Sequence, residues 1–187
     1  IIQFSSEVNS GFNAQLNLIN YDLQLKGIDN IYVSDSQAVM IQPANREIIV
    51  KKNRDFTFGG RVMAGNFEFL GSEYYFTYDI FKLDLIHVDS ARIYVEDYEH
   101  LDDYGKPSKL KVKSVIHNIV GDLKIDAPTN KGGVQSRFYP QYPILTTTKS
   151  SYVYWQHERI QKGAYKKDQF FYEIDPFSID SLDNFSK

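Results

Sequence analysis

The most regular part of the chain is residues 56–97, FTFGGRVMAGNFEFLGSEYYFTYDIFKLDLIHVDSARIYVED. Within it, apolar and polar residues alternate in short runs, and glycines separate one run from the next. Successive side chains of a β-strand point to opposite faces of a sheet, so this alternation is typical of strands joined by tight turns. The pattern predicts an all-β fold without any helix longer than about three turns. Its expected core residues are Phe67, Phe69, Phe76, Leu83 and Leu85.

The composition agrees with this prediction and argues against several classes of function. The 14 tyrosines and 13 phenylalanines are of types that favour strands. The net charge is −3 with both signs interspersed, and nucleic acid requires a basic face, so no nucleic-acid partner is expected. The chain has no cysteine for a disulfide or a thiolate metal site. No apolar run approaches the roughly 20 residues of a membrane-spanning helix, so no membrane-spanning segment is expected.

Two stretches of the chain resemble each other. YDLQLKGIDNIYVSD (21–35) and FKLDLIHVDSARIYVED (81–97) share an apolar-x-Leu-x-Leu run and a closing Ile-Tyr-Val-x-Asp, and FSIDSL (177–182) is a fainter copy. Repeats of this kind favour a β-solenoid-like stack of short strands, in which Leu25 would lie in register with Leu85. Any two strand–turn–strand units can share such residues, and this interpretation leaves a β-sandwich or an open barrel as the alternative.

The expected domain organisation follows from a change in sequence pattern along the chain, from regular alternation to a segment without a sustained period. We expect one β-rich domain over residues 1–187, with a strand-rich core and possible repeats over residues 1–125. Residues 126–187 are expected to form one long aromatic-rich loop and a closing strand, QFFYEIDPF (169–177), which Pro176 ends.

Smaller segments give further expectations. FNAQLNLI (12–19) alternates and predicts a half-buried strand. EDYEHLDDYGKP (96–107) is expected to be an acidic, turn-rich loop, and residues 156–162 a short helical turn closed by Gly163. Lys109, Lys111 and Lys113 would share one solvated strand face.

Residues with catalytic or metal-binding chemistry are scattered. His87, His100, His117 and His157 show no close zinc-ligand spacing, and no serine lies in a glycine-framed elbow. An acidic cluster in residues 96–103 offers oxygens to calcium but lacks the alternate-residue spacing of an EF-hand, so a solvated acidic turn is the favoured interpretation. Its carboxylates are Glu96, Asp97, Glu99, Asp102 and Asp103. We therefore expect no catalytic residues, no metal, no cofactor and no enzyme activity.

Aromatic residues near the C-terminal end form the strongest candidate ligand site. Flat rings with polar tips suit sugars and extended peptides. The simpler alternative is that these rings attach the long loop to the sheet. The candidate residues are Tyr139, Tyr142, Tyr152, Tyr154 and Trp155, with Tyr165 close by in sequence.

Three segments resemble a family of very large uncharacterised Bacteroidetes proteins. They are SYVYWQHERIQKGAYKKDQFFYEIDPFSIDSLDNF (151–185), FGGRVMAGNFEFLGSEYYFTYDIFKLDLIHVDS (58–90) and YPQYPI (139–144). The resemblance implies a β-rich, solenoid-like segment of a much longer cell-envelope protein, periplasmic or associated with the outer membrane. It implies no catalytic residues.

Together these observations lead to an expected function. It is a non-catalytic structural or interaction module of a large cell-envelope protein, with a carbohydrate- or peptide-binding module as the alternative. The expected partners are the rest of the parent polypeptide, other envelope proteins or glycan. Both ends of the chain stay apolar, which predicts that it continues on both sides and self-associates through an exposed surface near Phe177 and Phe185.

Overall fold

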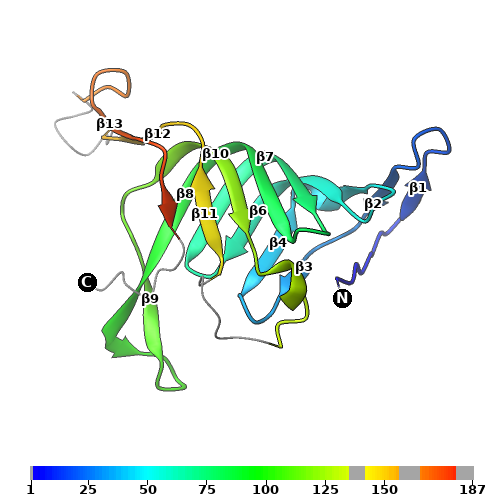
Figure 1. The fold of residues 1–187 in the computed structure, drawn as a ribbon, viewed down its shortest axis with the longest axis horizontal. Helices are drawn as coiled ribbons and strands as arrows, with labels where there is room; N and C mark the ends of the chain where they lie inside the picture. The colour runs from blue at the N-terminus through cyan, green and yellow to red at the C-terminus, as the bar shows by residue number, and fades with distance from the viewer. Residues whose placement is uncertain (1, 135–141, 156–164, 180–187) are drawn as a thin grey trace.

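The structure is a computed structural model that describes residues 2–134, 142–155 and 165–179 (Figure 1). These residues form fourteen strands and two short 3₁₀ turns, and they contain no α-helix, which confirms the all-β prediction. Within the same ranges no helix is long and apolar enough to cross a membrane. The strands are β1 (Ala14–Leu16), β2 (Leu23–Lys26), β3 (Ile31–Ser34), β4 (Val39–Pro43), β5 (Glu47–Val50), β6 (Phe56–Ala64), β7 (Phe67–Thr77), β8 (Lys82–Leu101), β9 (Pro107–Lys111), β10 (Ile116–Lys124), β11 (Ile144–Thr147), β12 (Ser151–Tyr154), β13 (Phe171–Ile174) and β14 (Ser178–Ile179). The turns are η1 (Ala44–Arg46) and η2 (Pro128–Asn130).

Four long strands, β6, β7, β8 and β10, form the centre of one antiparallel sheet. Each of the two outer strands of this group has different neighbours along its length. The first residues of β6 pair with β5, and its last five pair with β4. Likewise the start of β10 pairs with β12, and its end pairs with β11. The central strands therefore run through two leaves of the sheet, and each leaf has its own flanking strands.

The boundary between the two leaves is a line of irregular pairing, which we call the glycine crease. The register shifts at Gly59 between β6 and β7, around Gly71 between β7 and β8, and before Gly121 between β8 and β10. A Cβ atom on Gly71 would collide with the carbonyl oxygen of His87, and one on Gly121 would collide with that of Thr146. Bulges increase local twist and bend the strand that carries them. Glycine is required at the crease because neighbouring backbones approach too closely for a side chain.

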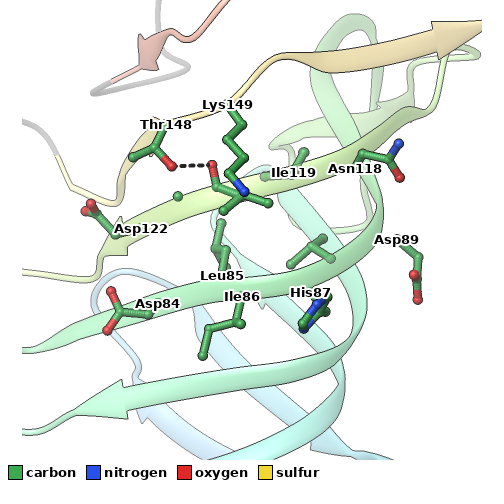
Figure 2. A pocket seen from close by; sticks show the side chains of 13 residues that line it. Asp84, Leu85, Ile86, His87, Asp89, Asn118, Ile119, Asp122, Thr148 and Lys149 are labelled. Atoms are coloured by element: carbon green, nitrogen blue, oxygen red, sulfur yellow. Dashed lines mark hydrogen bonds between the residues drawn. The ribbon is translucent and has the colours of Figure 1, made fainter.

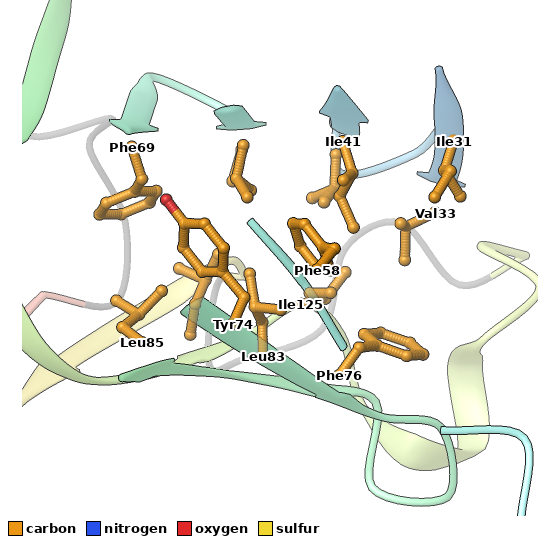
Figure 3. Packing of buried hydrophobic residues seen from close by; sticks show 14 of the residues in the cluster. Ile31, Val33, Ile41, Phe58, Phe69, Tyr74, Phe76, Leu83, Leu85 and Ile125 are labelled. Atoms are coloured by element: carbon orange, nitrogen blue, oxygen red, sulfur yellow. The ribbon is translucent and has the colours of Figure 1, made fainter. Parts of the chain in front are cut away.

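The bend brings the inner faces of the two leaves together around one hydrophobic core. Figure 3 shows Ile31, Ile41 and Phe69 pointing toward Phe76 and Leu83 from the opposite side. The core residues predicted from the alternation are all buried, so that prediction is confirmed. They are Phe67, Phe69, Phe76, Leu83 and Leu85.

A solenoid stack is not confirmed, because the two similar stretches do not lie next to each other. Leu25 pairs with Ala14 and Ile48, and Leu85 pairs with Tyr74 and Gly121. Strands β5, β6 and β7 lie between β2 and β8 in the sheet. The open antiparallel sheet is compatible with the alternative, a sandwich or an open barrel.

Three local expectations were wrong. Residues 12–19 include strand β1, but every one of them is exposed, because the β1–β2 hairpin extends beyond the core. Residues 96–107 form a turn only at 102–106, because β8 continues to Leu101 and pairs with β9. The expected long loop contains η2 and strand β11. The helical turn at 156–162 falls outside the described residues, as does Phe185, whereas Phe177 is half-buried and packs on the core.

One carboxylate on the outer face of the sheet is buried among polar partners. Glu68 Oε2 accepts a hydrogen bond from the Tyr94 hydroxyl at 2.6 Å, and Oε1 lies 2.7 Å from Arg61 Nη2. Arg92 Nη1 lies 3.7 Å from the same oxygen. Burial alone would raise the pKa of Glu68, but the Tyr94 hydroxyl and the two guanidinium groups outweigh it, and the pKa is lowered.

Because this pKa is lowered in the folded state, the charged form of Glu68 stabilises the fold. The contribution is complete above the ordinary pKa of 4.5 and is lost as the pH falls through the lower folded value. We expect Glu68→Gln to lower the free energy of unfolding by about 1–3 kcal/mol at neutral pH. Urea unfolding of both proteins between neutral pH and about pH 3 should show this difference shrinking below pH 4.5. A difference that stays constant over this range would contradict the assignment.

Candidate ligand-binding surface

The β12–β13 hairpin projects from the body of the molecule beside the start of β10 (Figure 1). In its register Tyr154 lies opposite Phe171, and Tyr152 lies between Glu173 and His117. Paired residues of antiparallel strands share a face, and residues two apart on one strand do as well. Tyr152, Tyr154 and Phe171 therefore form one surface, the aromatic face, with His117 and Glu173 at its rim.

The three rings of the aromatic face are in mutual contact. The ring centroids of Tyr152 and Tyr154 are 6.1 Å apart, and their planes differ by 17°. The Phe171 ring stands edge-on to both, at 5.7 Å from Tyr152 and 6.4 Å from Tyr154. Phe171 keeps 49% of its surface exposed, so the rings are not covered as core residues are. The result is a contiguous apolar patch that remains open to solvent.

Polar groups surround this patch. Lys167 Nζ lies 4.3 Å from the centroid of the Tyr154 ring, and the Tyr152 hydroxyl donates to Glu173 Oε1 at 3.4 Å. The His117 ring lies 5.1 Å from that of Tyr154, and its Nδ1 lies 3.1 Å from the Asp89 carbonyl oxygen. A carbonyl only accepts, so Nδ1 carries the proton and Nε2 keeps its lone pair. The rim thus offers an ammonium, a carboxylate and an imidazole acceptor.

Two pKa shifts describe the charge state of this rim. Burial lowers the pKa of His117, an effect that the Asp89 carbonyl only partly opposes, so the imidazole is neutral at pH 7. The Glu173 carboxylate raises the pKa of Tyr152, with a smaller contribution from burial, so its hydroxyl stays protonated. The face therefore provides stacking area and hydrogen bonds around one lysine and one glutamate.

The structure unites only part of the predicted aromatic cluster. Tyr152 and Tyr154 meet as expected, and Trp155 follows directly after β12 with an exposed side chain. Tyr142 lies just before β11. Strand β11 pairs with the last residues of β10, where Ile144 lies opposite Lys124, whereas β12 pairs with the first residues of β10. Tyr139 falls outside the described residues. Tyr165 contacts Phe170, with 4.7 Å between ring centroids.

Sequence reasoning missed Phe171 and His117. Phe171 lay within the predicted closing strand, and its alternation with Glu173 would have placed both on one face. His117 gave no such signal, because only the pairing of β10 with β12 brings it to the rings.

A groove of about 650 Å³ follows β8 and β10 across the glycine crease (Figure 2). Asp84 and Asp122 lie opposite each other along it, and Lys149 extends over β10. Asp84 Oδ1 lies 2.7 Å from Lys82 Nζ, and His87 Nδ1 lies 2.7 Å from Glu73 Oε2. Asp84 and His87 are thus held by neighbours as in a structural network, which makes the groove the weaker candidate. Asp122 Oδ1 is buried without a hydrogen-bond partner among the described residues.

A third cluster lies in the β8–β9 hairpin, where the register slips between Asp97 and Leu101. One ligand atom each from Asp97, Glu99 and His100 falls within 4.8 Å of the others. Of the five carboxylates considered for calcium, this cluster includes only two. His100 Nδ1 lies 2.9 Å from Asp97 Oδ2, a hydrogen bond that occupies both groups without an ion. We assign no metal to it.

Comparison with protein-family models, with curated proteins and with solved structures gives no match. The candidate site is therefore interpreted from its own geometry. The resemblance to large Bacteroidetes proteins, and the cell-envelope location that it implies, stay predictions.

Proposed function

We propose that this chain is a non-catalytic interaction module that binds an extended ligand on the aromatic face of β12–β13. The observation that carries the proposal is the open patch formed by Tyr152, Tyr154 and Phe171 on a hairpin that projects from the body. Aromatic rings in such positions contribute little to a core, and they supply much of the binding energy where a partner covers them.

The rest of the architecture supports an interaction role. Hairpins β1–β2 and β8–β9 also extend from the bent sheet (Figure 1), and they expose large side chains such as Phe12 and Tyr104. A module built in this way offers surfaces at several corners and keeps its core between the leaves. As a segment of a larger envelope protein, it would act as a β-scaffold that holds these surfaces apart.

Carbohydrate is the ligand class that the aromatic face fits best. Tyr152 and Tyr154 present nearly parallel rings at alternate positions of one strand, and such rings can pack against the C–H faces of sugar rings. Lys167, Glu173 and His117 at the rim can donate to or accept from hydroxyl groups. One positive and one negative charge together favour a neutral glycan over a strongly anionic one.

The proposal predicts that Tyr154→Ala and Phe171→Ala weaken glycan binding at least about tenfold, because each removes a ring from the patch. Affinity electrophoresis against a panel of neutral and acidic polysaccharides would find the ligand, and calorimetry would give the affinities. The matched control is Tyr104→Ala, which removes an exposed ring of the same type from the β8–β9 turn and should leave binding unchanged. Melting temperatures should stay close to that of the parent protein for all three variants.

Other outcomes separate the alternatives. Retention of an unfolded polypeptide instead of glycans, lost in the same two variants, would support the face as a peptide site. An equal effect of Tyr104→Ala, or no retention of any ligand, would contradict the proposal.

A further inference from the structure

Strand β1 has one open edge in the part of the chain that the structure describes. It pairs only with β2, and the β1–β2 hairpin extends away from the core (Figure 1). The backbone hydrogen bonds show which groups face that edge. Asn13 accepts from Lys26, and Asn17 donates to Asp22, each at 2.9 Å. Because alternate residues of a strand direct their N–H and C=O groups to opposite sides, those of Ala14 and Leu16 point to the open edge.

This edge lacks the usual protection against pairing. Residues 8–21 contain no aspartate, glutamate, lysine or arginine. Proteins commonly protect an open edge with charged side chains, and the other projecting hairpins follow that rule. Strand β9 carries Lys109 and Lys111, and β13 carries Glu173.

The apolar residues of β1 also lie on the core side of the sheet. Leu16 pairs with Leu23, which in turn pairs with Val50, a residue that packs on the core. The inner face of the sheet thus continues outward onto β1, where nothing of the described chain covers it. Leu16, which lies on this face, keeps 50% of its surface exposed.

We propose that β1 pairs antiparallel with β1 of a second copy of this chain, around a two-fold axis at Gln15. In that register Ala14 faces Leu16 of the other copy, and the backbone groups at the open edge find partners. The identity of the occupant follows from the lack of charge. An identical strand adds no buried or repelling charge, and it matches apolar residues to apolar residues and amides to amides along the whole strand.

The proposal predicts a concentration-dependent dimer that light scattering coupled to size exclusion detects. Leu16→Lys should raise the dissociation constant at least about tenfold, because it brings two positive charges close together at the axis. The matched control is Leu70→Lys. Leu70 is 50% exposed, as Leu16 is, but it lies on the outer face of β7. Its variant should dimerise like the parent protein.

A charge-swap experiment separates lost pairing from lost folding. Leu16→Lys and Leu16→Glu should each be monomeric alone, and an equal mixture should form a heterodimer because the charges then attract. A parent protein that stays monomeric at every accessible concentration would overturn the proposal. So would a dimer that Leu16→Lys leaves intact, or a mixture of the two variants that stays monomeric.

Discussion

Gly121→Ala is expected to lower the free energy of unfolding by about 3 kcal/mol, although it adds only one methyl group. The new Cβ would collide with the Thr146 carbonyl oxygen and lie 2.8 Å from Thr147 Cα. Both atoms belong to the backbone of β11, which cannot move away without breaking its pairing with β10. Urea unfolding followed by circular dichroism would measure the loss.

The matched control for this substitution is Gly132→Ala. The nearest atom to a Cβ there is the end of the Val134 side chain, 3.8 Å away. With no collision, the change should be within about 1 kcal/mol and on the stabilising side, because alanine restricts the unfolded chain. If both variants unfold at the same urea concentration as the parent protein, the close approach at the crease is not a constraint.

Phe76→Ala is expected to lower the free energy of unfolding by about 3–5 kcal/mol. Phe76 is fully buried, and its ring centroid lies 4.7 Å from that of Phe56 and 5.9 Å from that of Phe81. The substitution leaves a cavity where the two leaves meet. A loss of this size is a large part of the 5–15 kcal/mol that stabilises a typical domain, so the variant should melt far below the parent protein.

Leu70→Ala serves as the comparison, because it truncates a half-exposed side chain on the outer face of the same strand. It should change stability by no more than about 0.5–1 kcal/mol. Equal losses in the two variants would mean that Phe76 does not lie in the main core.

The core could be predicted from the sequence because alternation is a local property. Phe67, Phe69 and Phe76 lie at alternating apolar positions of short runs, and a strand turns every second side chain toward the core. The same reasoning was wrong for residues 12–19, which alternate equally well but lie beyond the core. Alternation indicates which residues share a face, and it cannot indicate whether another layer covers that face.

The arrangement of strands could not be predicted, because it depends on contacts between residues far apart in sequence. The two stretches that suggested a solenoid share the leucines, valines and aspartates common to many strand–turn units. Their partners are set elsewhere, by β5 beside Leu25 and by β7 and β10 beside Leu85. The aromatic face has the same origin. Tyr152 and Tyr154 follow from local alternation, and His117 joins them only through the sheet.

The glycine crease also limits how this sequence can diverge during evolution. At Gly59, Gly71 and Gly121 the space for a side chain is occupied by the backbone of a neighbouring strand. A second substitution can shrink a neighbouring side chain, but it cannot remove a neighbouring carbonyl group. Descendants of the same ancestor should therefore exchange their core leucines and phenylalanines long before they lose glycine at these three positions. The spacing of these glycines would then identify a common origin after the surrounding residues no longer do.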